Sequence, residues 1–211
     1  MYFTSTQGSN GSEGIEKIMF STLGKKCTEL MIRNNIITQA DRELYEYAFE
    51  ILISQCANII LCFVLGGIFH STFPTLLYLM FFVPLRVYAG GYHAPNYLLC
   101  YFGSFLIIIF FLVIGNIAQL SLTLIFLLLI LSDILIWFVS PIEDANKPLT
   151  ENEVKSFKLK IRIIELVELA IIFISFICNV EIKFIFFMAA SHYTVAFLLL
   201  VSIVAHYKNN V

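Results

Sequence analysis

The sequence predicts an all-α polytopic membrane protein with six transmembrane helices, both termini in the cytoplasm, and an interfacial helix near the amino end. Composition is the first observation: of 211 residues, 59% are hydrophobic and 13% are charged, and the mean hydropathy is +0.87. A soluble domain carries roughly 25% charged and about 45–50% apolar residues, so a water-soluble globule is not expected. The second observation is a series of apolar runs close to the ~20 residues that a helix needs to cross a bilayer.

The chain before the first apolar run falls into two parts. Residues 1–14 are polar and lack the basic start and apolar core of a signal peptide, so we expect a disordered lead-in or a remnant added for expression. Residues 15–38 carry apolar side chains at helical spacing, among them Ile15, Ile18 and Leu23, with charged residues largely between them. This pattern predicts an amphipathic helix on the membrane surface, although an ordinary helix packed against the transmembrane bundle fits it equally well.

Residues 39–211 are expected to form a single transmembrane domain. Its six predicted spans are residues 47–69, 73–88, 97–115, 118–140, 159–178 and 182–205. The second span is the weakest because Pro84 interrupts it and Arg86 ends its apolar part, so a short or partly re-entrant segment is an alternative.

The distribution of positive charge predicts the orientation of these spans. Twelve of the 13 Lys and Arg residues fall on the side of the amino terminus, and only Lys183 falls on the other side. Because cytoplasmic loops hold an excess of Lys and Arg, both termini and the loop of residues 90–96 are expected in the cytoplasm. The net charge of −2 and the absence of a long basic run argue against nucleic acid as a partner.

The junction between the second and third spans holds the candidate catalytic residues. Its sequence, RVYAGGYHAPNYLLC, runs from Arg86 to Cys100 and includes His93. Pro95 and Asn96 favour a helix start near residue 97, which would put Cys100 in or just after the first turn. A cysteine reacts as its thiolate, which a neighbouring histidine or a helix amino terminus favours. The residues alone leave two interpretations open: a Cys–His pair, or an interfacial histidine beside a buried cysteine.

A resemblance favours the first interpretation. The pattern Arg86-x4-Gly91-x-His93-x6-Cys100, within AGGYHA, resembles the signature of the AgrB family, the accessory gene regulator B endopeptidases that process quorum-sensing propeptides in Gram-positive bacteria. Size and hydrophobic profile are similar to the family over roughly residues 20–205. The resemblance implies that Cys100 and His93 are the catalytic pair of a cysteine endopeptidase, with Arg86 and Gly91 in support.

The resemblance also implies a reaction and its partners. In this family the enzyme removes the C-terminal tail of an AgrD-like propeptide through a thioester acyl-enzyme, and a side chain of the same peptide closes a thiolactone or lactone ring. Backbone N–H groups near Gly90 and Gly91 or around Cys100 would stabilise the oxyanion. Arg86 would bind a substrate carboxylate, hold the loop or reach the lipid headgroups. The resemblance further implies a multi-pass protein of the cell membrane, in contact with lipid. Its active site would face the cytoplasm, and a homodimer is a possible assembly.

Charged residues elsewhere provide further candidates. Asp133 is a candidate orienter for His93, the alternative being a structural pair with Arg162, Lys158 or another helix. A basic loop is expected to recruit the acidic propeptide tail or to anchor against anionic lipid, through Lys147, Lys155, Lys158 and Lys160. Glu165 and Glu168 share one helix face, a weak signal of a metal or proton relay, and His192 is expected to form an interhelical hydrogen bond.

Two other classes of function remain open. A small transporter or peptide-export subunit would use the buried acids as a proton or ion path, but the halves show no evident repeat and the sharpest polar cluster lies at one surface. A noncatalytic membrane scaffold would not need Cys100 for its function. The five cysteines lack CxxC spacing and are odd in number, so neither a zinc site nor a disulfide framework is suggested. No cofactor is expected.

Overall fold

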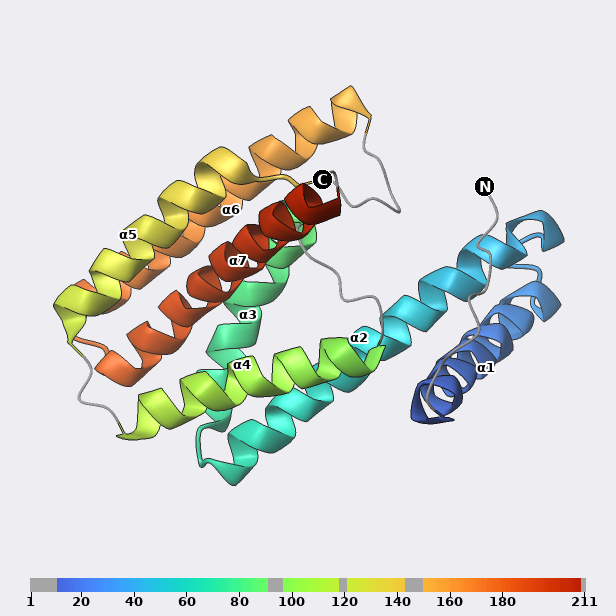
Figure 1. Ribbon diagram of the computed structural model, residues 1–211, viewed down its shortest axis with the longest axis horizontal. Helices are drawn as coiled ribbons and strands as arrows, with labels where there is room; N and C mark the ends of the chain where they lie inside the picture. The colour runs from blue at the N-terminus through green and yellow to red at the C-terminus, as the bar shows by residue number, and fades with distance from the viewer. Residues whose placement is uncertain (1–10, 91–96, 118–120, 143–149, 210–211) are drawn as a thin grey trace. The chain divides into compact units, whose positions relative to one another are not determined.

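The structure, a computed structural model, describes residues 11–90, 97–117, 121–142 and 150–209 (Figure 1). Within these residues the α-helices are α1 (Gly11–Arg33), α2 (Arg42–Ile68), α3 (Thr72–Ala89), α4 (Tyr97–Ile117), α5 (Leu122–Val139), α6 (Glu151–Ile177) and α7 (Ile182–Asn209). A short 3-10 helix, η1 (Gln39–Asp41), precedes α2. These ranges contain no β-strand, only an isolated bridge between Gly90 and Ile142, so the all-helical class is confirmed for them.

Five stretches of the described chain are long and apolar enough to cross a membrane. They are Gln39–Ile68, Thr72–Ala89, Leu99–Ile117, Leu122–Val139 and Ile182–Val204. The structure therefore contains a multi-pass set of helices, but the fifth predicted span, residues 159–178, lies in α6 and is not one of the five stretches. Its apolar side chains are interrupted by Arg162, Glu165 and Glu168. The six-span topology and its orientation stay predictions.

The second predicted span forms one continuous helix. α3 is 18 residues long and runs through Pro84. A proline inside a helix removes one backbone hydrogen bond and kinks or breaks most helices. Here the helix continues for five residues beyond it, so the spanning alternative is favoured over the re-entrant one.

The chain divides into two compact units, Met1–Leu61 with Ala94–Ser104, and Cys62–His93 with Phe105–Val211. In the first unit α1 packs against α2. Thr28 is fully buried, and a Cβ at Gly24 would lie 3.0 Å from the Glu46 carbonyl oxygen. Arg42 adds an ion pair to Glu29 at 3.1 Å. The sequence left two alternatives for this segment, a helix on the membrane surface and a helix packed against other helices. These contacts fit the packed helix, and they do not test whether α1 also lies at the membrane surface.

Left-handed residues end three of the helices. Asn35, His70 and Asn179 have φ values of 54°, 50° and 56°. After each, a backbone N–H bonds to a carbonyl five residues back, Ile36 to Met31, Ser71 to Gly66 and Val180 to Ser175. This Schellman arrangement satisfies carbonyl groups that a helix end leaves unpaired. It allows short turns from α2 to α3 and from α6 to α7.

The second unit is built around α7, which packs most extensively against α3 and α5 (Figure 1). Its core is a cluster of buried apolar side chains from four helices, Leu85, Ala89, Ile136, Ile161, Val195, Ala196 and Leu199. On the other part of α3, Tyr78 packs its ring against Phe111 of α4 and donates a hydrogen bond to Thr194 of α7 at 3.1 Å. The carboxyl ends of α3 and α5 meet at the bridge between Gly90 and Ile142, which positions the candidate site residues of this unit.

Candidate active site

Cys100 is the fourth residue of α4 and is half-buried. The predicted helix start near residue 97 is confirmed, because α4 begins at Tyr97. The first turn of a helix has N–H groups without intrahelical partners and carries partial positive charge. Such a position favours the thiolate of a cysteine over the thiol. The fold of α4 therefore provides one of the two aids to reactivity that the sequence predicts.

A polar seam joins α4 to α2 within the first unit. It consists of Ser54 and Asn58 on α2 and Tyr101 and Ser104 on α4. The Tyr101 hydroxyl donates to the Ser54 carbonyl at 3.2 Å and lies 3.2 Å from the Ser54 hydroxyl, while the Asn58 amide donates to the Ser104 hydroxyl at 2.9 Å. The seam flanks the turn that carries Cys100 and fixes α4 against α2.

Sequence analysis missed this seam, although the signal for it is present. Glu50, Ser54 and Asn58 recur every four residues in an otherwise apolar span, so they lie on one face of α2. Polar side chains at membrane depth are costly unless they are paired, so a regular polar face indicates a facing polar partner. What the spacing did not identify is the partner helix.

Arg86 and Gly90 close the carboxyl end of α3 in the second unit. Gly90 has φ 68° and ψ −141°, and a Cβ at this position would overlap the Ile142 carbonyl oxygen. The Ile142 N–H donates to the Ala89 carbonyl oxygen at 3.0 Å. The Arg86 guanidinium donates to the Gly90 carbonyl oxygen. Of the three roles that the sequence left open for Arg86, this contact supports holding the loop.

The remaining members of the predicted catalytic motif, Gly91 and His93, lie outside the described residues, as does Lys147. Cys100 belongs to the first unit and Arg86 with Gly90 to the second. The structure thus brings Arg86 and Gly90 together with the chain that follows α5. The predicted Cys–His contact is not tested.

The basic segment forms the amino-terminal half of α6. A capping box begins the helix: the Thr150 hydroxyl accepts from the Glu153 N–H, and the Glu153 carboxylate accepts from the Thr150 N–H at 2.9 Å. Lys155 and Lys158 are exposed. The Lys160 ammonium lies 5.2 Å from the centroid of the Tyr88 ring, at the carboxyl end of α3. The basic half of α6 is therefore at the same end of the second unit as Arg86.

Asp133 has a partner on another helix. It is buried in α5, and its Oδ1 lies 2.7 Å from Nδ1 of His192 on α7. The interhelical hydrogen bond predicted for His192 is confirmed. For Asp133, this contact is the structural alternative that the sequence left open, and a role as orienter of His93 stays a prediction.

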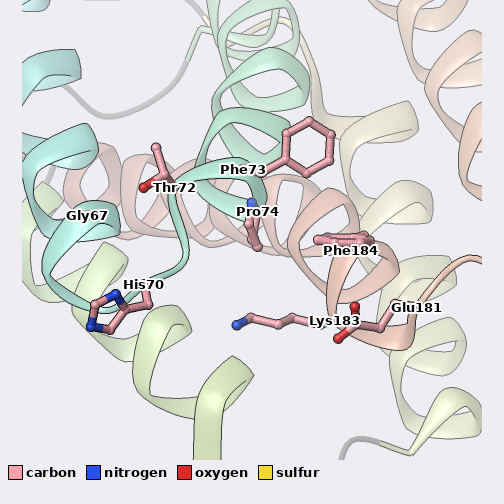
Figure 2. A pocket seen from close by; sticks show the side chains of 8 residues that line it. All are labelled: Gly67, His70, Thr72, Phe73, Pro74, Glu181, Lys183 and Phe184. Atoms are coloured by element: carbon pink, nitrogen blue, oxygen red, sulfur yellow. The ribbon is translucent and has the colours of Figure 1, made fainter.

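A pocket of about 470 Å³ lies at the other end of the second unit. It is lined by Gly67, His70, Thr72, Phe73, Pro74, Glu181, Lys183 and Phe184 (Figure 2). The Lys183 side chain extends toward His70 (Figure 2), and its ammonium donates to the Asn116 side-chain oxygen at 2.8 Å. Of the predicted site residues that the structure describes, neither Cys100 nor Arg86 nor Gly90 lines this pocket.

These features define a multi-pass helical membrane protein with a half-buried cysteine at the start of one apolar helix. The family model described as "AgrB: Accessory gene regulator B" matches residues 24–206. The chain belongs to the AgrB family, as its motif between Arg86 and Cys100 predicts. No curated protein and no solved structure matches the chain. Family membership fits a role in quorum-sensing propeptide processing and implies an AgrD-like propeptide as substrate.

Proposed function

We propose that this protein is an integral-membrane cysteine endopeptidase that removes the C-terminal tail of an AgrD-like propeptide and promotes its cyclisation. The observation that carries the proposal is the family match over residues 24–206, which includes the whole Arg86–Cys100 motif. Cys100 is the nucleophile and His93 the general acid and base. The site faces the cytoplasm of the cell in which the propeptide is made.

The first acyl transfer cleaves the propeptide. His93 accepts the proton of the Cys100 thiol, and the thiolate attacks the carbonyl carbon of the scissile peptide bond. The C–N bond then breaks, and the amine of the tail leaves with the proton from His93. The remaining peptide is held on Cys100 as a thioester.

The second acyl transfer closes the ring. A thiol or hydroxyl side chain of the bound peptide loses its proton to His93 and attacks the thioester carbon. The C–S bond to Cys100 breaks, and the Cys100 sulfur takes the proton back. A thiolactone or lactone leaves, and the enzyme returns to its starting state. Both steps pass through an oxyanion, for which backbone N–H groups near Gly90 and Gly91 or at the start of α4 are the proposed donors.

The described geometry supports the arrangement of this site in three ways. The start of α4 favours the thiolate of Cys100, and the α2–α4 polar seam limits the movement of the turn that carries it. The Arg86 guanidinium contacts the Gly90 carbonyl, and Gly90 forms a bridge to Ile142. Both contacts stabilise the end of α3, from which the chain continues to His93. The exposed Lys155 and Lys158 provide positive charge for an acidic propeptide tail.

The test is processing by purified protein in liposomes. A candidate propeptide is added, and its products are followed by mass spectrometry. Wild type is expected to release the tail and to form a covalent peptide adduct on Cys100. Cys100→Ala should give neither, and His93→Ala should slow both acyl transfers by about 10²-fold or more.

Matched variants separate catalysis from folding. Cys56→Ala removes an exposed cysteine from α2 and should process at the wild-type rate. His70→Asn removes a histidine whose φ is 50°, a conformation that asparagine tolerates, and should also be active. Tail release by folded Cys100→Ala at the wild-type rate would overturn the proposal.

A further inference from the structure

A buried polar cluster joins α5, α6 and α7 inside the second unit. His192 of α7 is fully buried between two acids: Nδ1 lies 2.7 Å from Asp133 Oδ1, and Nε2 lies 3.2 Å from Glu168 Oε2. The second contact has the distance of an ion pair but not the angle of a hydrogen bond. Asp133 and Glu168 are only 8% and 6% exposed. Each imidazole nitrogen is therefore placed to carry a proton toward a carboxylate.

Glu165 adds a third acid to this cluster. Its side chain is 1% exposed, and neither carboxylate oxygen has a hydrogen-bond partner among the described residues. Glu165 lies one helical turn before Glu168 on the same face of α6, and the charges that act on it are those of Asp133, His192, Arg162 and Glu168. Glu165 is thus a buried acid next to a polar cluster, and no described group forms a hydrogen bond with its carboxyl group.

The neighbouring charges do not compensate an ionised Glu165. The Arg162 guanidinium stacks on Trp137 at 4.7 Å from the ring centroid, and within the described chain it has no ion pair within 4.0 Å. If His192 is protonated, its charge and that of Arg162 balance the charges of Asp133 and Glu168. An additional buried negative charge would then be unpaired, and burial of an unpaired carboxylate is so unfavourable that the acid holds its proton instead.

The other polar groups around the cluster leave this balance unchanged. On α7, the Tyr193 hydroxyl donates to the Ile125 carbonyl oxygen at 2.7 Å. On α3, which packs against α7, the Tyr78 hydroxyl donates to Thr194. Both are neutral and already hydrogen-bonded. No group of three or more His, Cys, Asp and Glu side chains in the described residues has an arrangement that holds a metal ion.

We propose that Asp133, Glu165, Glu168 and His192 form a buried proton-binding site that holds two protons, one at His192 between Asp133 and Glu168 and one on Glu165. The ligand of this site is the proton. The proposal is independent of the peptidase assignment, because it uses neither Cys100 nor His93. The proposal gives a specific role to the buried acids, which in the sequence analysis were the basis for the alternative of a proton or ion path.

Proton binding at this site is coupled to the packing of α6. α6 packs chiefly against α3 and approaches α5 and α7 at fewer positions. Loss of the Glu165 proton would leave a charge that must reach water, which weakens the contact of α6 with α5 and α7. Because the same helix carries the exposed Lys155 and Lys158, the protonation state also controls how firmly this basic segment is held.

The test is infrared spectroscopy of the purified full-length protein in detergent, labelled with ¹³C at the side-chain carboxyl carbon of glutamate. At neutral pH the wild type should show the C=O band of one protonated glutamate, shifted by the label. Glu165→Gln should lose this band. Glu151→Gln removes an exposed acid from the first turn of the same helix and should keep it.

A second readout follows the coupling by hydrogen exchange, first in the wild type and then in Glu165→Gln. As the pH is raised, loss of the band should be accompanied by lower protection of the α6 amides, after correction for the intrinsic base-catalysed exchange rate. Glu165→Gln should remove this pH dependence of the protection. No labelled C=O band in the wild type, or a band that persists in Glu165→Gln, would overturn the proposal. So would a band that follows the Na⁺ concentration instead of the pH.

Discussion

Replacement of Gly90 by alanine tests the geometry at the end of α3. The residue has φ 68° and ψ −141°, which is close to the region that glycine alone occupies freely. A Cβ there would also overlap the Ile142 carbonyl oxygen, a backbone atom of the chain after α5. The substitution therefore has to move the backbone and cannot be accommodated by a rotamer change.

The expected magnitude follows from two contributions. The unfavourable backbone conformation costs about 1–3 kcal/mol for a residue with a side chain. Displacement of Ile142 breaks the 3.0 Å bond between its N–H and the Ala89 carbonyl, at a further cost of about 1 kcal/mol. The sum, about 2–4 kcal/mol, corresponds to a roughly 30- to 1,000-fold lower population of the intact turn.

Hydrogen exchange of the Ile142 amide measures this population directly. In Gly90→Ala the amide should exchange faster by the factor above, and propeptide processing should fall with it. Gly67→Ala is the control, because no atom lies within 4 Å of a Cβ at that position in α2. Unchanged protection of Ile142 in a folded Gly90→Ala protein would refute the structural reasoning.

Three further predictions concern the seam, the basic segment and the core. Asn58→Leu removes the 2.9 Å bond to Ser104 and should destabilise the first unit by about 1 kcal/mol and slow processing several-fold, as measured by thermal unfolding in detergent and in the liposome assay. The double substitution Lys155→Gln with Lys158→Gln should weaken binding of a synthetic acidic tail peptide several-fold at low salt and little at high salt. Leu199→Ala, at a fully buried position, should cost about 2–5 kcal/mol in thermal unfolding.

Each of these variants has a matched control. Gln55→Leu removes an amide from an exposed position of α2, and Lys25→Gln with Lys26→Gln removes two exposed charges from α1. Leu200→Ala truncates a neighbouring leucine that is 46% exposed. Equal effects of Asn58→Leu and Gln55→Leu, or of the two leucine variants, would show that the contacts named here do not carry the stability. A salt-independent loss of tail binding would contradict an electrostatic role for Lys155 and Lys158.

Helix positions were the most predictable part of the fold. Pro95 and Asn96 predicted the start of α4, and Cys100 lies in its first turn as expected. Start signals of this kind are local, because the backbone preferences of proline and asparagine act on adjacent residues. Whether α6 crosses the membrane was less predictable. Glu165 and Glu168 lower its mean hydropathy, and yet both side chains are buried. Hydropathy treats each side chain alone and takes no account of its partner.

The family could be predicted from the sequence by itself, and the proposed catalytic motif also comes from the sequence alone. Membrane character depends on composition, and the motif depends on the spacing of Arg86, Gly91, His93 and Cys100, so neither requires knowledge of which helices meet. Only the tertiary structure decided that Asp133 pairs with His192 across 59 positions of sequence, and that Asn58 pairs with Ser104 across 46. The physical reason is that a buried polar group is stabilised by whichever partner packing brings within hydrogen-bond distance, and no local pattern specifies that partner.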